Sequence, residues 1–178
     1  MKYNPGIHRR RSIRLKDYDY SQAGMYFMTI CTQNRECLFG EIADGAIQLN
    51  DVGKMIEKWY FELMNKFPDI QYGEHIVMPN HIHCIIQNVG ADLCVCPNKV
   101  GEHIGSPLRD VVQWFKTMTT NEYIRHVKQN GWKTFNGKLW QRNYYEHIIR
   151  NENDLNQIRE YIINNPLKWD LDKENPSI

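Results

Sequence analysis

Two histidines separated by a single residue are the first feature of this sequence that could carry chemistry. His81 and His83 lie in the segment Met-Pro-Asn-His-Ile-His-Cys-Ile-Ile (78–86), whose apolar and β-branched residues are typical of a buried strand. Side chains at i and i+2 of a strand point to the same face, so the two imidazoles are expected to project together. Convergent imidazoles are half of a divalent metal site. As an isolated motif, however, His-x-His occurs more often among ordinary core or surface histidines.

A tyrosine and an asparagine near the end of the chain form a second candidate pair. Tyr161 and Asn165 are four residues apart in a segment with helical spacing of apolar residues, which places both on one helix face. Because Pro166 disfavours α geometry at the residue before it, Asn165 is expected at the helix end, with its side chain turned toward an ion. The alternative is that Tyr161 belongs to the apolar stripe and that Asn-Pro is an ordinary helix stop.

Two further tyrosines compete for the role of nucleophile. Tyr144 and Tyr145 precede Glu146 and His147, and a tyrosine beside a histidine can be activated by a general base. The alternation of a strand would send Tyr145 and His147 to one face and Tyr144 and Glu146 to the other. We therefore interpret this segment as a strand whose aromatic residues are partly core and partly ligand-facing.

The elements that must position these residues follow from hydrophobic periodicity and from capping and turn residues. Strands are predicted over 26–32, 38–42, 47–49, 74–78, 81–87 and 140–149, and helices from the cap Asn50 to before Pro68, over 108–128, and from Asn151 or Asn153 to Pro166. The segment 89–107 is expected to be a long loop. This order predicts an α+β domain with a central antiparallel sheet and helices packed on it.

Length and charge indicate one domain behind a basic arm. The chain has 178 residues, and residues 1–20 hold six basic and two acidic side chains, a net charge of +4 in a chain of net charge +1. We predict an arm over 1–20 and a single domain over 21–178. A basic arm can hold a nucleic-acid backbone or can simply aid solubility.

Composition also restricts where the protein acts. No run of 18 apolar residues is present, and residues 1–14 lack the apolar core of a secretory signal, so a cytoplasmic protein with no membrane partner is expected. The five cysteines are an odd number and are expected to be reduced thiols. Cys94-Val95-Cys96 has no second cysteine pair to complete a zinc ribbon.

Together the motifs resemble the HUH (His–hydrophobic–His) motif and flanking blocks of the Y1 tyrosine transposases, in particular the REP-associated branch (RAYT). Beyond 78–86, the similar blocks are 10–15, 19–21, 24–27, 31–35, 38–40, 49–54, 140–150 and 161–166. They extend over nearly the whole chain and occur in the family's order.

The resemblance implies a ferredoxin-like HUH fold and a particular chemistry. Tyr161 would be the nucleophile, and His81, His83 and Asn165 would bind Mg²⁺ or Mn²⁺, although two imidazoles and an amide also suit zinc. The family cuts single-stranded DNA near hairpins through a covalent 5′-phosphotyrosine, as a monomer or a homodimer. The residues proposed to contact DNA are Arg9, Arg10, Arg11, Arg14, Lys116, Arg142 and Tyr144.

Other functions are compatible with parts of the pattern. A regulator that binds hairpin DNA with weak or no catalysis would keep the basic arm, and a metal phosphodiesterase or RNA endonuclease would use water in place of Tyr161. A histidine-triad nucleotide hydrolase is excluded, because the third histidine that it needs is replaced by Ile85.

Overall fold

The computed structural model of the protein describes residues 19–90 and 105–177. The DNA contacts predicted for Arg9, Arg10, Arg11 and Arg14 and the cysteines of the Cys-x-Cys motif lie outside the described residues. Within the described part of the chain, no helix is both long and apolar enough to cross a membrane.

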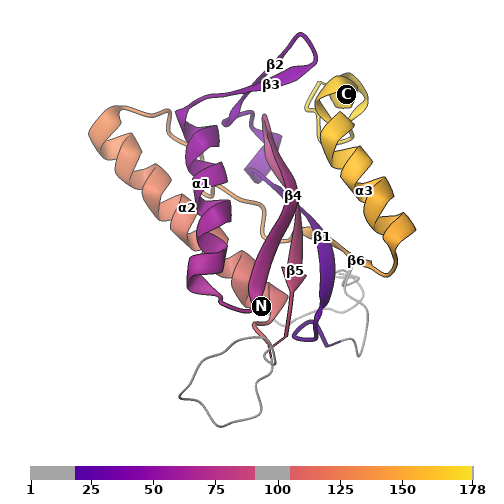
Figure 1. Cartoon of the computed structure of the whole chain (residues 1–178). Helices are drawn as coiled ribbons and strands as arrows, with labels where there is room; N and C mark the ends of the chain where they lie inside the picture. Colours follow the sequence, from indigo (N-terminus) through magenta and orange to yellow (C-terminus); the bar gives the residue numbers. More distant parts are fainter. Residues whose placement is uncertain (1–18, 91–104, 178) are drawn as a thin grey trace, which may run out of the picture.

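A four-stranded antiparallel sheet forms the centre of the molecule (Figure 1). Its strands, in spatial order, are β4 (Ile70–Met78), β5 (His81–Asn88), β1 (Gly24–Cys31) and β6 (Tyr145–Ile149). The two central strands, β5 and β1, carry nearly continuous runs of buried side chains because the sheet is covered on both faces. A separate hairpin of β2 (Gly40–Ala43) and β3 (Ala46–Leu49) is closed by a turn at Asp44-Gly45.

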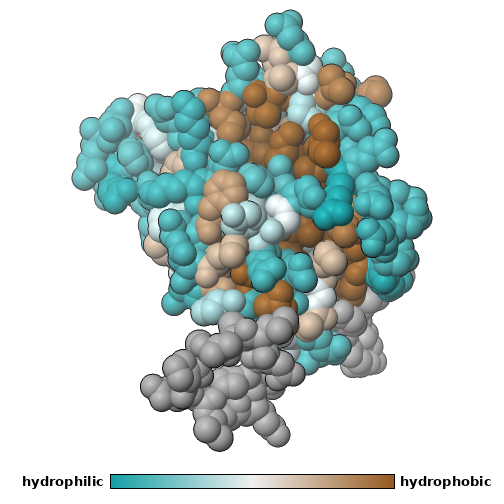
Figure 2. Space-filling model, viewed as in Figure 1, coloured by the Kyte–Doolittle hydropathy of each residue, from teal (hydrophilic) through white to brown (hydrophobic). Residues whose placement is uncertain are grey.

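Helices cover both faces of the sheet, which confirms the predicted α+β architecture (Figure 1). α1 (Asp51–Lys66) and α2 (Leu108–Asn130) pack with the even-numbered residues of β5 in the larger core, and α3 (Glu152–Asn164) packs with Ile85 and Phe27 in a smaller core. In the same view, Figure 2 shows hydrophobic surface gathered between α1 and α3, with hydrophilic side chains along the outer sides of α2 and α3. The odd-numbered residues of β5, which include both histidines, therefore face α3.

Asn50 begins α1 as predicted. Its side-chain oxygen accepts a hydrogen bond from the Gly53 amide at 3.0 Å, and its Nδ2 donates to the Leu38 carbonyl at 3.0 Å. The first bond satisfies an amide that the first turn of a helix leaves unpaired, and the second ties the helix start to the chain before β2.

Two strands begin at least four residues away from their predicted starts. β4 begins at Ile70 rather than at residue 74 and contains an irregularity between Tyr72 and His75. The prediction of a strand from residue 140 was wrong, because β6 begins at Tyr145 and only Trp140 forms an isolated bridge, with Thr32. The carbonyls of residues 141–143 accept hydrogen bonds from the Lys116 ammonium, which belongs to α2.

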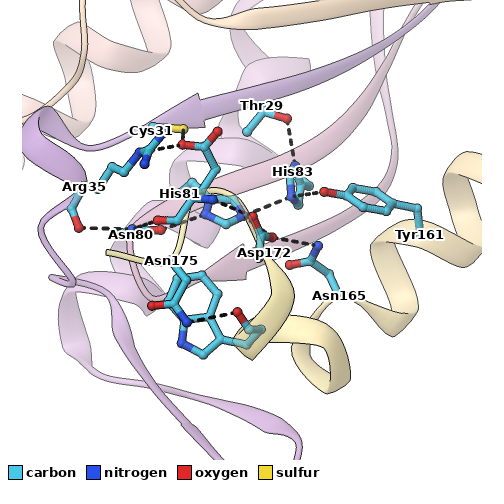
Figure 3. Close-up of polar contacts among 12 residues, drawn as sticks. Thr29, Cys31, Arg35, Asn80, His81, His83, Tyr161, Asn165, Asp172 and Asn175 are labelled. Carbon is cyan, nitrogen blue, oxygen red and sulfur yellow. Dashed lines mark hydrogen bonds and ion pairs between the residues drawn. The ribbon is translucent and has the colours of Figure 1, made fainter. Parts of the chain in front are cut away.

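α3 ends before Pro166 with Asn165 at its end, as predicted, but the backbone after it differs from the prediction. Asn165 keeps helical dihedral angles (φ −60°, ψ −42°), and Pro166 starts a 3₁₀ helix, η3 (Pro166–Leu171), that the sequence reading did not foresee. Proline is tolerated at the first position of a helix, where its missing N–H has no intrahelical partner to lose. The chain therefore turns directly from α3 into a segment, 166–177, that runs back to the sheet beside the histidines (Figure 3).

Candidate metal centre and nucleophile

His81 and His83 project from β5 to the same face of the sheet, as predicted from their spacing. Both are buried, with 0% and 1% of their surface exposed, and their Nε2 atoms lie 2.9 Å apart (Figure 3). Two nitrogens bound at right angles to one ion, at 2.0–2.1 Å each, would also be about 3 Å apart. The pair thus has the spacing of two ligands of one ion.

Neighbouring polar groups orient both rings through the Nδ1 atoms. Nδ1 of His81 lies 2.8 Å from Oδ1 of Asn80, and Nδ1 of His83 lies 2.8 Å from the Thr29 hydroxyl. Because the Asn80 oxygen carries no hydrogen, Nδ1 of His81 must be the donor, which leaves a lone pair on its Nε2. Such partners hold a metal-binding imidazole in the right tautomer and direction.

Burial also sets the charge of the pair. It lowers the pKa of His81 to about 4, and it lowers the pKa of His83 well below its usual value, with the neighbouring His81 acting in the same direction. Both rings are therefore neutral at pH 7. A neutral imidazole is the form that binds a metal ion.

Tyr161 reaches this centre from α3. Its hydroxyl lies 3.3 Å from Nε2 of His83 (Figure 3). Its ring packs edge-on against Phe27. Partial burial, followed by the nearby carboxylate of Asp172, raises the pKa of Tyr161 to about 12, while a hydrogen bond from Asn165 acts in the opposite direction. The side chain remains 40% exposed, so a large substrate can reach it.

Asn165 lies beside the histidines together with a residue that the sequence reading missed, Asp172. Nδ2 of Asn165 donates to Oδ2 of Asp172 at 3.2 Å, and that oxygen is 4.0 Å from Nε2 of His81. The other amide atom, Oδ1 of Asn165, is buried and has no hydrogen-bond partner among the described residues. In the sequence, Asp172 is one of several charges after Pro166, and no spacing rule distinguishes it from its neighbours Asp170 and Glu174.

The donors present fit a divalent cation. Ligand atoms of His81, His83 and Asp172 all lie within 4.8 Å of one another, and all three side chains are buried. The unpartnered amide oxygen of Asn165 is a fourth potential donor next to them. Imidazole nitrogens combined with oxygen donors suit first-row divalent ions.

The three described residues predicted to contact DNA lie in one groove on the opposite side of the sheet. Lys116, Arg142 and Tyr144 line a hollow of about 890 Å³ between α2 and the segment 137–146. The Lys116 ammonium is held by three backbone carbonyls and lies 5.4 Å from the centre of the Tyr144 ring, and burial lowers its pKa to about 8. Glu146 lines the same groove, as the predicted alternation of β6 requires. Lys116 therefore shapes the groove wall.

Known proteins resemble this chain in sequence and in fold. A protein of Haemophilus influenzae with no characterised function is 41% identical over 181 residues, which cover 97% of this chain and 96% of the relative. A second protein of Haemophilus influenzae, provisionally assigned as a REP-associated tyrosine transposase, is 26% identical over 84% of this chain and 74% of its own. No protein-family model matches the chain.

The solved structure of a REP-associated tyrosine transposase bound to a REP hairpin shares the fold. Its TM-score is 0.51 at 21% identity, over 87% of this chain and 73% of that chain. The antiparallel sheet with helices on both faces is thus an architecture that this chain shares with that protein. Sequence and fold together confirm the resemblance to the REP-associated tyrosine transposases that the motifs indicated.

Proposed function

We propose that this protein cuts and rejoins single-stranded DNA beside hairpins, with Tyr161 as nucleophile and with Mg²⁺ or Mn²⁺ held by His81, His83 and Asn165. The observation that supports this most directly is the 3.3 Å distance between the Tyr161 hydroxyl and Nε2 of His83. Nucleophile and metal donors belong to the same chain, so a monomer contains the complete set. The hairpin in the solved relative supports the choice of substrate.

The chemical step exchanges one phosphate ester for another. The Tyr161 oxygen attacks the phosphorus of a phosphodiester, forming a Tyr161 O–P bond while the bond from phosphorus to the 3′ oxygen breaks. The products are a 5′-phosphotyrosine and a free 3′ hydroxyl, which takes up the equivalent of the phenolic proton. Attack by this hydroxyl, or by one from another strand, reverses the step. Joining therefore needs no external energy source.

The chain's own residues prepare this step in two ways. Asn80 and Thr29 fix the imidazoles that bind the ion, and Phe27 supports the Tyr161 ring against the sheet. A bound divalent ion supplies positive charge that withdraws electron density from the scissile phosphate. That charge is needed because a phenol with a pKa of about 12 is a weak nucleophile toward an anionic ester at neutral pH.

Formation of a covalent adduct tests the proposal. We expect that a labelled oligonucleotide, carrying a hairpin from the DNA that flanks the chain's own gene, gives a protein–DNA adduct on denaturing gels with Mn²⁺. Tyr161→Phe should reduce adduct formation by at least about a thousandfold without changing DNA affinity. Tyr145→Phe is the matched control, because Tyr145 is a second exposed tyrosine next to Phe27.

The same assay separates the proposed function from its alternatives. Cleavage that survives in Tyr161→Phe without an adduct would show hydrolysis by water and overturn the assignment of Tyr161. Hairpin binding with neither cleavage nor adduct in the wild-type protein would support a binding regulator instead.

A further inference from the structure

Asp172 is a buried carboxylate at the point where the C-terminal segment meets the sheet. Only 8% of its surface is exposed. Its Oδ1 accepts a hydrogen bond from the Glu174 amide at 2.8 Å, and its Oδ2 accepts one from Nδ2 of Asn165 at 3.2 Å. The only ion-pair partner that the described residues offer it is His81, at 4.0 Å.

No lysine or arginine among the described residues forms a salt bridge with Asp172, and its Oδ2 faces the two imidazoles instead. Burying an ionised carboxylate without a compensating cation is costly. A divalent ion between the imidazoles and the carboxylate would supply the missing charge.

The positions of the donor atoms fit such an ion. Atoms bound to one ion at about 2.1 Å can be at most about 4.2 Å apart. The ligand atoms of His81, His83 and Asp172 lie within 4.8 Å of one another, so a shift of about half an ångström brings them into range. The amide of Asn165 also fits, since turning it by 180° would aim its unpartnered oxygen at the position that Nδ2 now occupies beside Asp172.

We infer that Asp172 is a ligand of the same divalent ion as His81 and His83, and that ion binding fastens the C-terminal segment 166–177 to the sheet. This inference rests on the metal site of the proposed function and adds an anionic donor to it. A carboxylate cancels one of the ion's two charges and shifts the donor set toward the oxygen ligands that Mg²⁺ and Mn²⁺ prefer.

Further contacts couple the segment to the histidines. Nδ2 of Asn80 donates to the Glu174 carbonyl at 2.7 Å, while Oδ1 of the same side chain orients His81 (Figure 3). Nε of Arg35 pairs with the Glu174 carboxylate at 3.1 Å. The ion, Asn80 and Arg35 therefore hold the C-terminal segment at neighbouring points. Loss of the ion should loosen the segment as a unit.

Metal affinity measured without DNA tests the ligand assignment. Mn²⁺ is titrated into the full chain and free Mn²⁺ is followed by electron paramagnetic resonance. We expect Asp172→Asn, which keeps the shape of the side chain, to weaken Mn²⁺ binding at least tenfold. Asp172→Glu should recover part of the affinity because it restores a carboxylate. Asp170→Asn is the matched control, since Asp170 is an exposed aspartate two residues away. Equal Mn²⁺ affinity in Asp172→Asn and wild type would overturn the inference.

Hydrogen exchange gives a second test, in which the wild-type protein is compared with and without Mn²⁺. Saturating Mn²⁺ should slow exchange of the amides in 166–177 at least tenfold, and should not do so in His81→Ala/His83→Ala. Exchange in this segment that is unaffected by Mn²⁺ would overturn the coupling.

Both measurements are separate from Tyr161 chemistry: Tyr161→Phe should bind Mn²⁺ like wild type. A protein that binds Mn²⁺ through Asp172 but forms no DNA adduct would refute the proposed function alone.

Discussion

At the scale of single residues, the unusual feature is that two buried histidines lie in contact with a partly exposed tyrosine, all three in their uncharged forms. Burial lowers the pKa of both imidazoles and raises that of the phenol to about 12. For the histidines this state is suited to binding a metal ion. It also has a cost, because an unfolded chain would bind protons at these histidines more readily than the folded protein does.

This cost predicts how stability depends on pH. In the metal-free protein the folded pKa of His81, about 4, lies below the ordinary pKa of histidine, about 6.5, so the unfolded state takes up protons first as pH falls. The free energy of unfolding should be constant above about pH 6.5 and should fall by roughly 1.4 kcal/mol per histidine per pH unit below it, until the folded pKa is reached. Urea unfolding between pH 7.5 and 4.5 measures this slope.

The double variant His81→Asn/His83→Asn is the control for this prediction, because asparagine does not titrate. Its unfolding free energy should vary less steeply over the same pH range. An identical slope in the two proteins would show that other groups cause the acid sensitivity.

At the scale of elements, the start of α1 is packed closely against the segment that contains Phe39 and Leu49. Gly53 stands in the first turn of the helix, where alanine is normally the better helix former. A Cβ at this position would overlap the carbonyl oxygen of Phe39 and come within 2.8 Å of Cδ2 of Leu49. At this position the packing of the helix against the β2–β3 hairpin outweighs helix propensity, so glycine is expected to be more stable than alanine.

We therefore expect Gly53→Ala to lower the free energy of unfolding by about 1–3 kcal/mol. Lys54→Ala, at the next and exposed position, should change it by less than about 0.5 kcal/mol. Urea unfolding followed by circular dichroism compares the two. Equal stabilities would mean that the hairpin moves away from the helix at little cost.

The elements also show where sequence reasoning works and where it stops. Alternation in β5 and the cap at Asn50 are local signals, and they correctly predicted the face shared by His81 and His83 and the start of α1. The position of Asp172 depends on Pro166 continuing the chain as a 3₁₀ helix, a choice among several turns that proline allows. The late start of β6, at Tyr145, likewise has no local signal, because the carbonyls before it bind Lys116, which comes from another element.

At the scale of the whole molecule, the sheet separates two differently equipped faces. The side facing α3 holds the histidines, Tyr161 and the C-terminal segment. The side facing α2 holds the 890 Å³ groove. Both reach the edge strand β6, since Tyr145 points to the first side and Glu146 lines the groove on the other. A DNA that occupies the groove could therefore pass around β6 to the nucleophile.

Charge in the groove leads to a prediction for this arrangement. Arg109, Lys138 and Arg142 line it, and none of them forms a salt bridge with another described residue. Unpaired cations along a groove are suited to phosphate contacts. We expect Arg109→Ala/Arg142→Ala to weaken hairpin binding about tenfold near 0.1 M salt and to reduce the salt dependence, the slope of log affinity against log salt, by about two.

The matched control is Lys54→Ala/Arg125→Ala, which removes the same charge from positions already paired with Asp51 and Glu122. Fluorescence anisotropy at several salt concentrations measures both doubles. If the DNA held by the groove is the one that Tyr161 cuts, adduct formation by the groove double at saturating DNA should match wild type, because the catalytic side is untouched. An equal loss of affinity in both double variants would instead indicate a general effect of net charge. It would contradict the prediction that DNA binds in the groove.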